Sequence, residues 1–104
     1  MAAAILAVRA EVPAAERDAF DDWYETDHLP LALRSFGARR AWRCWSLDDP
    51  AVHVAFYEFP DAAAAKAATA PDRIAPLVAD FDRVWGQRVR RRREILERRQ
   101  ELLP

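Results

Sequence analysis

Two neighbouring runs of alternating apolar residues constrain the fold of this 104-residue chain more than any other feature. The first run reads RRAWRCWSL and the second, VHVAFYEF, covers residues 52–59, with the polar turn DDPA between them. Both runs are rich in aromatic and β-branched side chains, so they predict a β-hairpin. In the second run Val54 and Phe56 point to one side, whereas His53 and Tyr57 point to the other. Both faces of the resulting sheet are therefore apolar, and each needs a cover.

The rest of the chain supplies two helices and two further strands. Residues 4–12 and 88–96 read as strands, and residues 13–29 carry apolar positions at helical intervals. Residues 60–85 predict a second helix, interrupted near Pro71 and Pro76 because each proline lacks a backbone donor and clashes with the preceding turn. The order βαββαβ indicates an α+β, ferredoxin-like fold whose antiparallel sheet carries both helices on one face.

Two helices can cover only one face of this sheet. The simplest cover for the second face is the same face of another copy, in a symmetric and self-complementary contact. The chain length predicts one domain, residues 1–104. We therefore expect a homodimer with a cavity between the two sheets, in which a small organic molecule binds.

Charge and cysteine content narrow the partners and the compartment. The net charge of −1 gives no overall field that would attract nucleic acid or an anionic membrane. Glutamates interrupt the arginine-rich run RVRRRREILERRQ, which favours a solvated strand edge or ion pairs over phosphate contacts, although one or two arginines are candidates for a cavity mouth. No apolar stretch is long enough to span a membrane. The lone Cys44 cannot form an intramolecular disulfide, so we expect a cytoplasmic protein.

The segment DDWYETDHLP carries the strongest chemical signal. Tyr24 and His28 are four residues apart and share a helix face, so a hydrogen-bonded pair can form. Near a helix end, with Asp27 close by, His28 would tend toward imidazolium and could hold or donate a proton. The alternative is that His28 only caps the last turn before Pro30 ends the helix, with Trp23 packed on the sheet.

His53 and Tyr57 form a second candidate pair. They project from the same side of their strand, which we assign to the cavity between the sheets, where they could hold an enol or phenol oxygen. The alternative places His53 in water and Tyr57 in a dimer core. Arg39 likewise belongs either to a solvated ion pair or to the cavity mouth, where it would hold a substrate.

The segment FDDWYETDHLPLAL, followed by FGARRAW and AFYEF, resembles the small dimeric α/β-barrel proteins related to EthD. The specific part is a W-Y-x-x-[DE]-H-x-P block at Trp23, Tyr24, Asp27, His28 and Pro30. The resemblance implies a ferredoxin-like protomer that dimerises through its sheets and binds a small organic molecule. The wider superfamily includes cofactor-independent oxygenases, lactone isomerases, polyketide cyclases, dehalogenating enzymes and haem-binding proteins, so the fold alone does not choose the chemistry.

Together these features predict a small cofactor-independent enzyme of isomerase, cyclase, lyase or oxygenase type. It would use acid–base chemistry on a small aromatic, lactone or polyketide-like carbonyl compound. The alternatives are a non-catalytic small-ligand dimer, a haem-binding dimer with His28 or His53 as the axial ligand, and a structural dimerisation module. The expected catalytic residues are His28, Tyr24 and Asp27, and the expected substrate-binding residues are Trp23, His53, Tyr57 and Arg39.

Overall fold

The computed structural model of the protein describes residues 2–104, and its four strands form one antiparallel sheet. The strands are β1 (Ala4–Glu11), β2 (Arg40–Trp45), β3 (Val52–Phe59) and β4 (Arg90–Glu97). Their order in the sheet is β2-β3-β1-β4, so the first and last strands of the chain are neighbours. This topology and the helices that cross between its strands confirm the α+β, ferredoxin-like fold.

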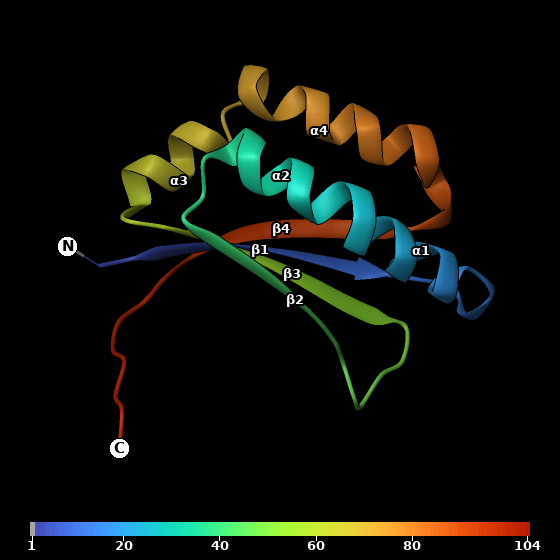
Figure 1. The fold of residues 1–104 in the computed structure, drawn as a ribbon, viewed down its shortest axis with the longest axis horizontal. Coiled ribbons are helices and arrows are strands. Elements are labelled where there is room, and N and C mark those ends of the chain that lie inside the picture. Colours follow the sequence, from blue (N-terminus) through green and yellow to red (C-terminus); the bar gives the residue numbers. More distant parts are fainter. Residues whose placement is uncertain (1) are drawn as a thin grey trace.

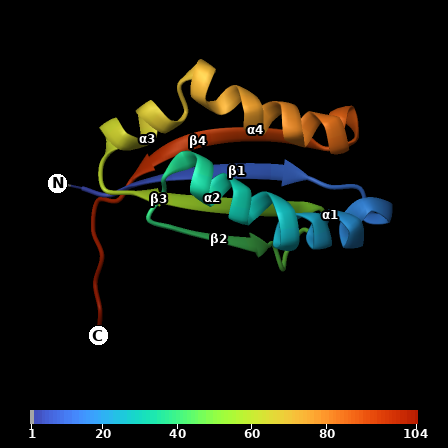
Figure 2. The same ribbon diagram turned by 45° about the horizontal axis from the view of Figure 1, so that its top comes forward.

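All of the helices lie on one face of the sheet, and the opposite face is open (Figure 1; Figure 2). The first helical segment consists of α1 (Arg17–Trp23), a π-helical turn (Tyr24–His28) and α2 (Leu29–Phe36). The second consists of α3 (Ala62–Ala68) and α4 (Pro71–Val84). No helix in residues 2–104 is long and apolar enough to cross a membrane.

The expected helix end before Pro30 is wrong, because the first helical segment continues through it to Phe36. At the π-helical turn the Leu29 N–H donates to the carbonyl of Tyr24, five residues earlier instead of four. Pro30 has no N–H and its ring crowds the carbonyl four residues before it, so a locally widened turn accommodates it. The segment ends at Gly37, whose φ of 65° is a left-handed conformation that glycine adopts without strain.

Only one of the two expected proline interruptions occurs in the second helical segment. The chain breaks between α3 and α4, and Pro71 occupies the first turn of α4, where a missing N–H costs nothing. Pro76 lies within α4 as an exposed residue, and the helix continues past it to Val84. The prediction is therefore confirmed at Pro71 and wrong at Pro76.

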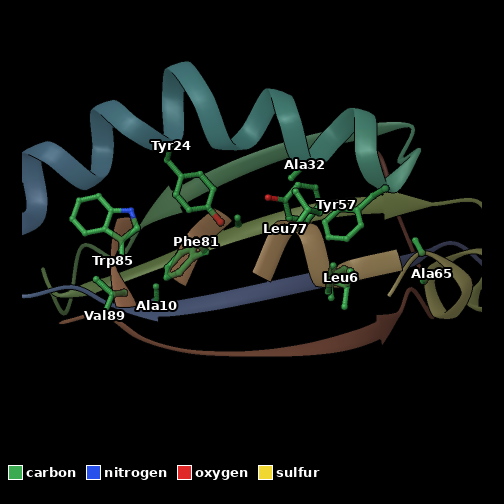
Figure 3. Close-up of a cluster of buried hydrophobic side chains, with 14 of the residues drawn as sticks. Leu6, Ala10, Tyr24, Ala32, Tyr57, Ala65, Leu77, Phe81, Trp85 and Val89 are labelled. Carbon is green, nitrogen blue, oxygen red and sulfur yellow. The ribbon is translucent and has the colours of Figure 1, made fainter. Parts of the chain in front are cut away.

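The core lies between the helices and the covered face of the sheet. Figure 3 shows Tyr24 and Ala32 from the first helical segment, and Leu77 and Phe81 from α4, packed toward Leu6 of β1. Small residues beneath the helices let the helix backbones approach the sheet. The fully buried alanines of the sheet are Ala4 and Ala55.

The strand register shows which side chains point to which face. Val54 and Phe56 point to the open face, where Phe56 stacks on Trp42 with ring centroids 5.3 Å apart. His53 and Tyr57 have the opposite parity and lie under the helices, where they are 0% and 1% exposed. The predicted alternation is therefore confirmed. Its assignment to a cavity between two sheets is wrong for His53 and Tyr57, because the helices cover this face.

Candidate functional site

A cavity of about 100 Å³ lies inside the protomer, between the covered face of the sheet and the helices. Its apolar lining consists of Val8, Phe36, Ile74, Leu77, Val78 and Phe81. Its polar lining consists of Tyr24, His28, Tyr57 and the arginines of β4, Arg91, Arg92 and Arg93. An apolar pocket with a few convergent polar groups is the usual form of a small-molecule site.

Tyr24 and Tyr57 bring two hydroxyl groups together at the wall of this cavity. Tyr24 comes from the π-helical turn and Tyr57 from β3, and their hydroxyls are close enough for each to affect the pKa of the other. Burial raises the pKa of Tyr24 to about 12, although the Tyr57 hydroxyl and the nearby Arg91 and Arg43 oppose this rise. Burial also raises the pKa of Tyr57 well above its ordinary value. Both phenols are therefore neutral at pH 7 and able to donate hydrogen bonds.

His28 is buried, with 7% of its surface exposed, and its ring is held on two sides. The Trp23 indole stacks on it with centroids 4.5 Å apart and planes 16° from parallel, and the Tyr24 ring meets it edge-on at 5.0 Å. Its Nδ1 lies 3.4 Å from Oδ2 of Asp80 on α4, close enough for attraction but without the alignment of a hydrogen bond. The carboxylate favours a proton on Nδ1, which leaves a lone pair on Nε2.

The surroundings of His28 make it a neutral imidazole, which corrects the expected imidazolium. Burial lowers the pKa of His28, and the charge of Arg91 acts in the same direction. Asp80 opposes this shift without overcoming it. The first helical segment does not end at His28, so His28 is not next to the carbonyl end of a helix that was expected to favour imidazolium. A neutral histidine beside a carboxylate suits a group that accepts a proton.

His53 belongs to a separate cluster beside the cavity. Its Nε2 lies 3.4 Å from Nη1 of Arg43. This arginine nitrogen also donates to Oδ1 of Asp21 at 2.7 Å. The Trp45 indole N–H also donates to Oδ1 of Asp21 at 2.7 Å. Burial lowers the pKa of His53 to about 4, with Arg43 adding to the effect, so the ring is neutral. This network ties α1 to β2 and packs His53 against the Tyr24 ring, 4.6 Å away between centroids.

The structure places the seven expected site residues in four different locations. Tyr24, His28 and Tyr57 line the cavity, whereas Trp23 and His53 pack behind it against His28 and Tyr24. Asp27 is exposed to solvent on the outside of the π-helical turn and is not among the lining residues. Arg39 lies on the open side of the sheet, where its Nε donates to Oε2 of Glu58 at 2.6 Å.

Where a Tyr24–His28 hydrogen bond was expected, the two rings meet edge-on with centroids 5.0 Å apart, and the Tyr24 hydroxyl lies near that of Tyr57. Two residues at the site, Asp80 and Arg91, are not singled out by the sequence. Asp80 is one of several acidic residues on an amphipathic helix, and only the packing of α4 against the π-helical turn places it next to His28. Arg91 is one of several arginines that the sequence offers for a cavity mouth, and the strand register selects it.

A haem does not fit the cavity. Cofactor-sized pockets have roughly 300–1,000 Å³, several times the volume found here. His53 has no exposed surface with which to meet a macrocycle, and Trp23 covers one face of the His28 ring. In residues 2–104 no group of three or more histidine, cysteine, aspartate or glutamate side chains is arranged to hold a metal ion.

The fold is that of the ferredoxin-like α+β proteins, as the likeness to solved structures shows. The chain is similar to an EthD-family protein from Bacillus halodurans, with a TM-score of 0.70 and 20% identity, covering 94% of this chain and 99% of that chain. It is also similar to SnoaB, a cofactor-independent oxygenase from Streptomyces nogalater, with a TM-score of 0.67, 17% identity and 96% coverage of both chains.

A third similar structure is a dimeric ferredoxin-like protein from an uncultured marine organism. The TM-score is 0.65 and the identity 14%, over 98% of this chain and 100% of that chain. No protein-family model matches the sequence, and no curated protein matches it significantly. At these identities the likeness establishes the fold, and the W-Y-x-x-[DE]-H-x-P block stays a prediction.

Proposed function

We propose that the protein binds a small organic carbonyl compound in the cavity between its helices and sheet and acts on it by acid–base chemistry without a cofactor. The observation that carries this proposal is the meeting of a neutral histidine with a pair of neutral tyrosine hydroxyls at one small apolar cavity. The fold likeness to SnoaB, a cofactor-independent oxygenase, supports the same class of chemistry.

In this proposal His28 is the base and the tyrosines bind the developing oxyanion. Nε2 of His28 takes a proton from the carbon next to the substrate carbonyl, and the electrons of the C–H bond move to the carbonyl oxygen as an enolate. The hydroxyls of Tyr24 and Tyr57 donate to that oxygen. Asp80 stabilises the imidazolium that forms, as a carboxylate beside a catalytic histidine does. Return of the proton at another atom completes an isomerisation.

The size of the cavity favours the smaller substrates among those expected. One water-sized group needs roughly 10–15 Å³ of such space, so about 100 Å³ holds a molecule of about seven to ten heavy atoms. A single aromatic ring or a small lactone meets this limit. A fused polyketide does not, unless helices or arginines move.

We also propose that the open face of the sheet is covered by a second copy of the chain. The face carries an apolar patch that includes Trp42 and Phe56, and it lines a hollow of about 350 Å³ that also involves Leu96. The C-terminal tail after β4 runs off on this open side (Figure 1). A dimeric ferredoxin-like neighbour supports this arrangement. A stable and well-folded monomer at micromolar concentration in sedimentation would contradict it.

Small molecules that co-purify with the protein test the cavity. Untargeted mass spectrometry should find a ring-sized carbonyl compound with the wild-type protein. Val78→Phe should abolish its retention, because Val78 lines the cavity and a phenyl group would fill it. Val84→Phe is the matched control, on the same helix but outside the lining. Equal retention by the two variants would contradict a site in this cavity.

The chemistry is tested with the compound so identified. His28→Gln should lower turnover by roughly 10²- to 10⁴-fold, the usual contribution of one positioned proton-transfer group, and leave the melting temperature nearly unchanged. Tyr24→Phe keeps the ring and removes the hydroxyl, so it should lower turnover with little change in folding. Wild-type turnover in both variants would show that these residues are structural and that the protein only binds its ligand.

A further inference from the structure

The cavity has cationic groups at its wall but no anionic one. Among the described residues that line it, three are arginines of β4, of which Arg91 and Arg93 point to the covered face by their register, and none is an aspartate or glutamate. The other polar groups, the two tyrosine hydroxyls and the His28 imidazole, are neutral at pH 7 for the reasons given above. A ligand inside therefore meets a positive potential in surroundings of low polarity, where charge interactions are stronger than in water.

Arg91 is the arginine that is placed to act on a ligand. It pairs with Ala10 in the strand register and points to the covered face, and its side chain is 21% exposed. Its guanidinium carbon lies 3.8 Å from the centre of the Phe81 ring, which holds the planar group at the cavity wall. It is close enough for its charge to affect both Tyr24 and His28.

The existing partner of Arg91 leaves it free to bind a ligand. One nitrogen, Nη1, donates to Oδ1 of Asp82 at 3.2 Å, and the Asp82 side chain is 56% exposed. Exposed ion pairs of this kind contribute about 0–1 kcal/mol. A guanidinium has five N–H donors, so other donors stay available while the stacking on Phe81 is kept.

The carboxylates near the cavity do not cancel this potential. Asp80 faces Nδ1 of His28 and accepts a hydrogen bond from Arg83 at 2.6 Å, and Asp82 is bound to Arg91. Both belong to α4 and neither lines the cavity. Asp80 is paired with Arg83 outside the cavity, and Asp82 occupies one nitrogen of Arg91 from the solvent side, so no carboxylate lies within the cavity itself.

We infer that the ligand of this cavity is a ring-sized organic anion, a phenolate, enolate or carboxylate, whose oxygen is bound jointly by the Arg91 guanidinium and the Tyr24–Tyr57 hydroxyl pair. This inference rests on the proposed function and adds the charge of the substrate to it. For an acid–base enzyme the consequence is direct, because a site that binds the ionised form also stabilises the enolate formed from a neutral carbonyl compound.

The test uses para-nitrophenol, a ring-sized phenol whose ionised form is coloured. Binding to an anion site lowers the apparent pKa of the phenol, so the phenolate absorbance rises at a fixed pH when protein is added. We expect a tenfold preference for the anion, which is a fall of about one pKa unit. Arg91→Gln should abolish this fall. Arg90→Gln, an equal charge change at the neighbouring position, should keep it, because the Arg90 side chain is 87% exposed and points to the open face.

Backbone NMR spectra recorded during the same titration separate the failure of this inference from the failure of the proposed function. If residues lining the cavity shift but the apparent pKa of the phenol stays constant or rises, the cavity binds ring compounds without preferring anions and the inference is overturned. If the pKa falls equally in the Arg91→Gln protein, the assignment to Arg91 is overturned. If no cavity residue shifts, the cavity does not take ring-sized compounds, and the proposed function falls with the inference.

Discussion

The two faces of the sheet carry similar apolar side chains, but their polar groups are stabilised in opposite ways. On the covered face the buried polar residues of β3, His53 and Tyr57, are neutral, and burial beneath the helices keeps them so. On the open face Glu58 is ionised, although its side chain is only 4% exposed. Arg40, Arg98 and Arg39 all donate to its carboxylate, and they lower its pKa to about 2.

This difference shows how each face meets its surroundings. A layer of helices excludes water and favours uncharged forms of titratable groups, which suits a cavity where protons are transferred. The arginines around Glu58 come from β2, from the residue just before β2 and from the tail after β4. Their charges therefore stabilise an ion-pair cluster at the open face and not a cavity. The four predictions that follow test this contrast.

The largest expected effect is on the covered face. Phe20 is fully buried and packs against rings from both layers, including Tyr24, His53 and Trp85. Phe20→Ala should lower the free energy of unfolding by about 3–5 kcal/mol, because it leaves a cavity at the centre of the aromatic core. Urea unfolding measures this change. The control is Leu31→Ala on the exposed side of α2, and an equal loss in both variants would contradict the contrast.

The open face should respond through association. Phe56→Glu places a charge in the apolar patch that we propose a second copy covers, so it should weaken dimerisation by roughly 10²-fold or more, as the loss of a central aromatic contact does. Sedimentation measures the mass, and alkylation of the exposed Cys44, which shares this face, should become faster in the variant. Leu31→Glu on the helical layer is the matched control. A dimer that tolerates Phe56→Glu would show that another surface joins the copies.

The apolar character of both faces could be predicted from alternation along the strands. Which face the helices cover could not. The apolar character of both faces followed from Val54, Phe56 and Tyr57 in one strand, and the fold followed from the order of elements. Which face the helices cover depends on how β3 pairs with β1 and on the small Ala4 and Ala55 beneath the helices. The assignment of His53 and Tyr57 to a cavity between sheets failed for that reason.

The site was predictable only where its residues are close in sequence. Tyr24 and His28 stand four apart in one segment, and that spacing brought them to attention. Asp80 approaches His28 across 52 residues of chain, and no local pattern distinguishes it from the other acids of α4. The exposure of Asp27 depends on the π-helical turn, which changes the direction of each side chain that follows it.

The two faces should also lose stability in different pH ranges. The lowered pKa of His53 means that the unfolded chain takes up a proton first as the pH falls, so this contribution is complete above about 6.5 and is lost toward 4. The lowered pKa of Glu58 makes its contribution complete above about 4.5 and lost toward 2. Each loss should be about 1–3 kcal/mol. His28, whose pKa is also lowered, adds to the upper range.

Urea unfolding at a series of pH values measures these two ranges. His53→Gln is neutral at every pH and should flatten the upper decline, whereas Glu58→Gln should flatten the lower one and leave the upper one in place. If the stability of Glu58→Gln were flat between pH 6.5 and 4, as expected for His53→Gln, the two faces would not be separate.

The smallest effect concerns two carboxylates: Asp80, which faces His28 from α4, and Asp27, which is next to it in the sequence. Asp80 raises the pKa of His28 against the effect of burial, so Asp80→Asn should lower that pKa further. Asp27 is exposed and not among the groups that shift His28, so Asp27→Asn should leave both the pKa and the stability unchanged within about 0.5 kcal/mol. NMR titration of the His28 ring measures both variants. A larger shift in Asp27→Asn than in Asp80→Asn would restore the expectation drawn from DDWYETDHLP. In that expectation, the residue next to His28 in the sequence sets its protonation, not the residue across the helix interface.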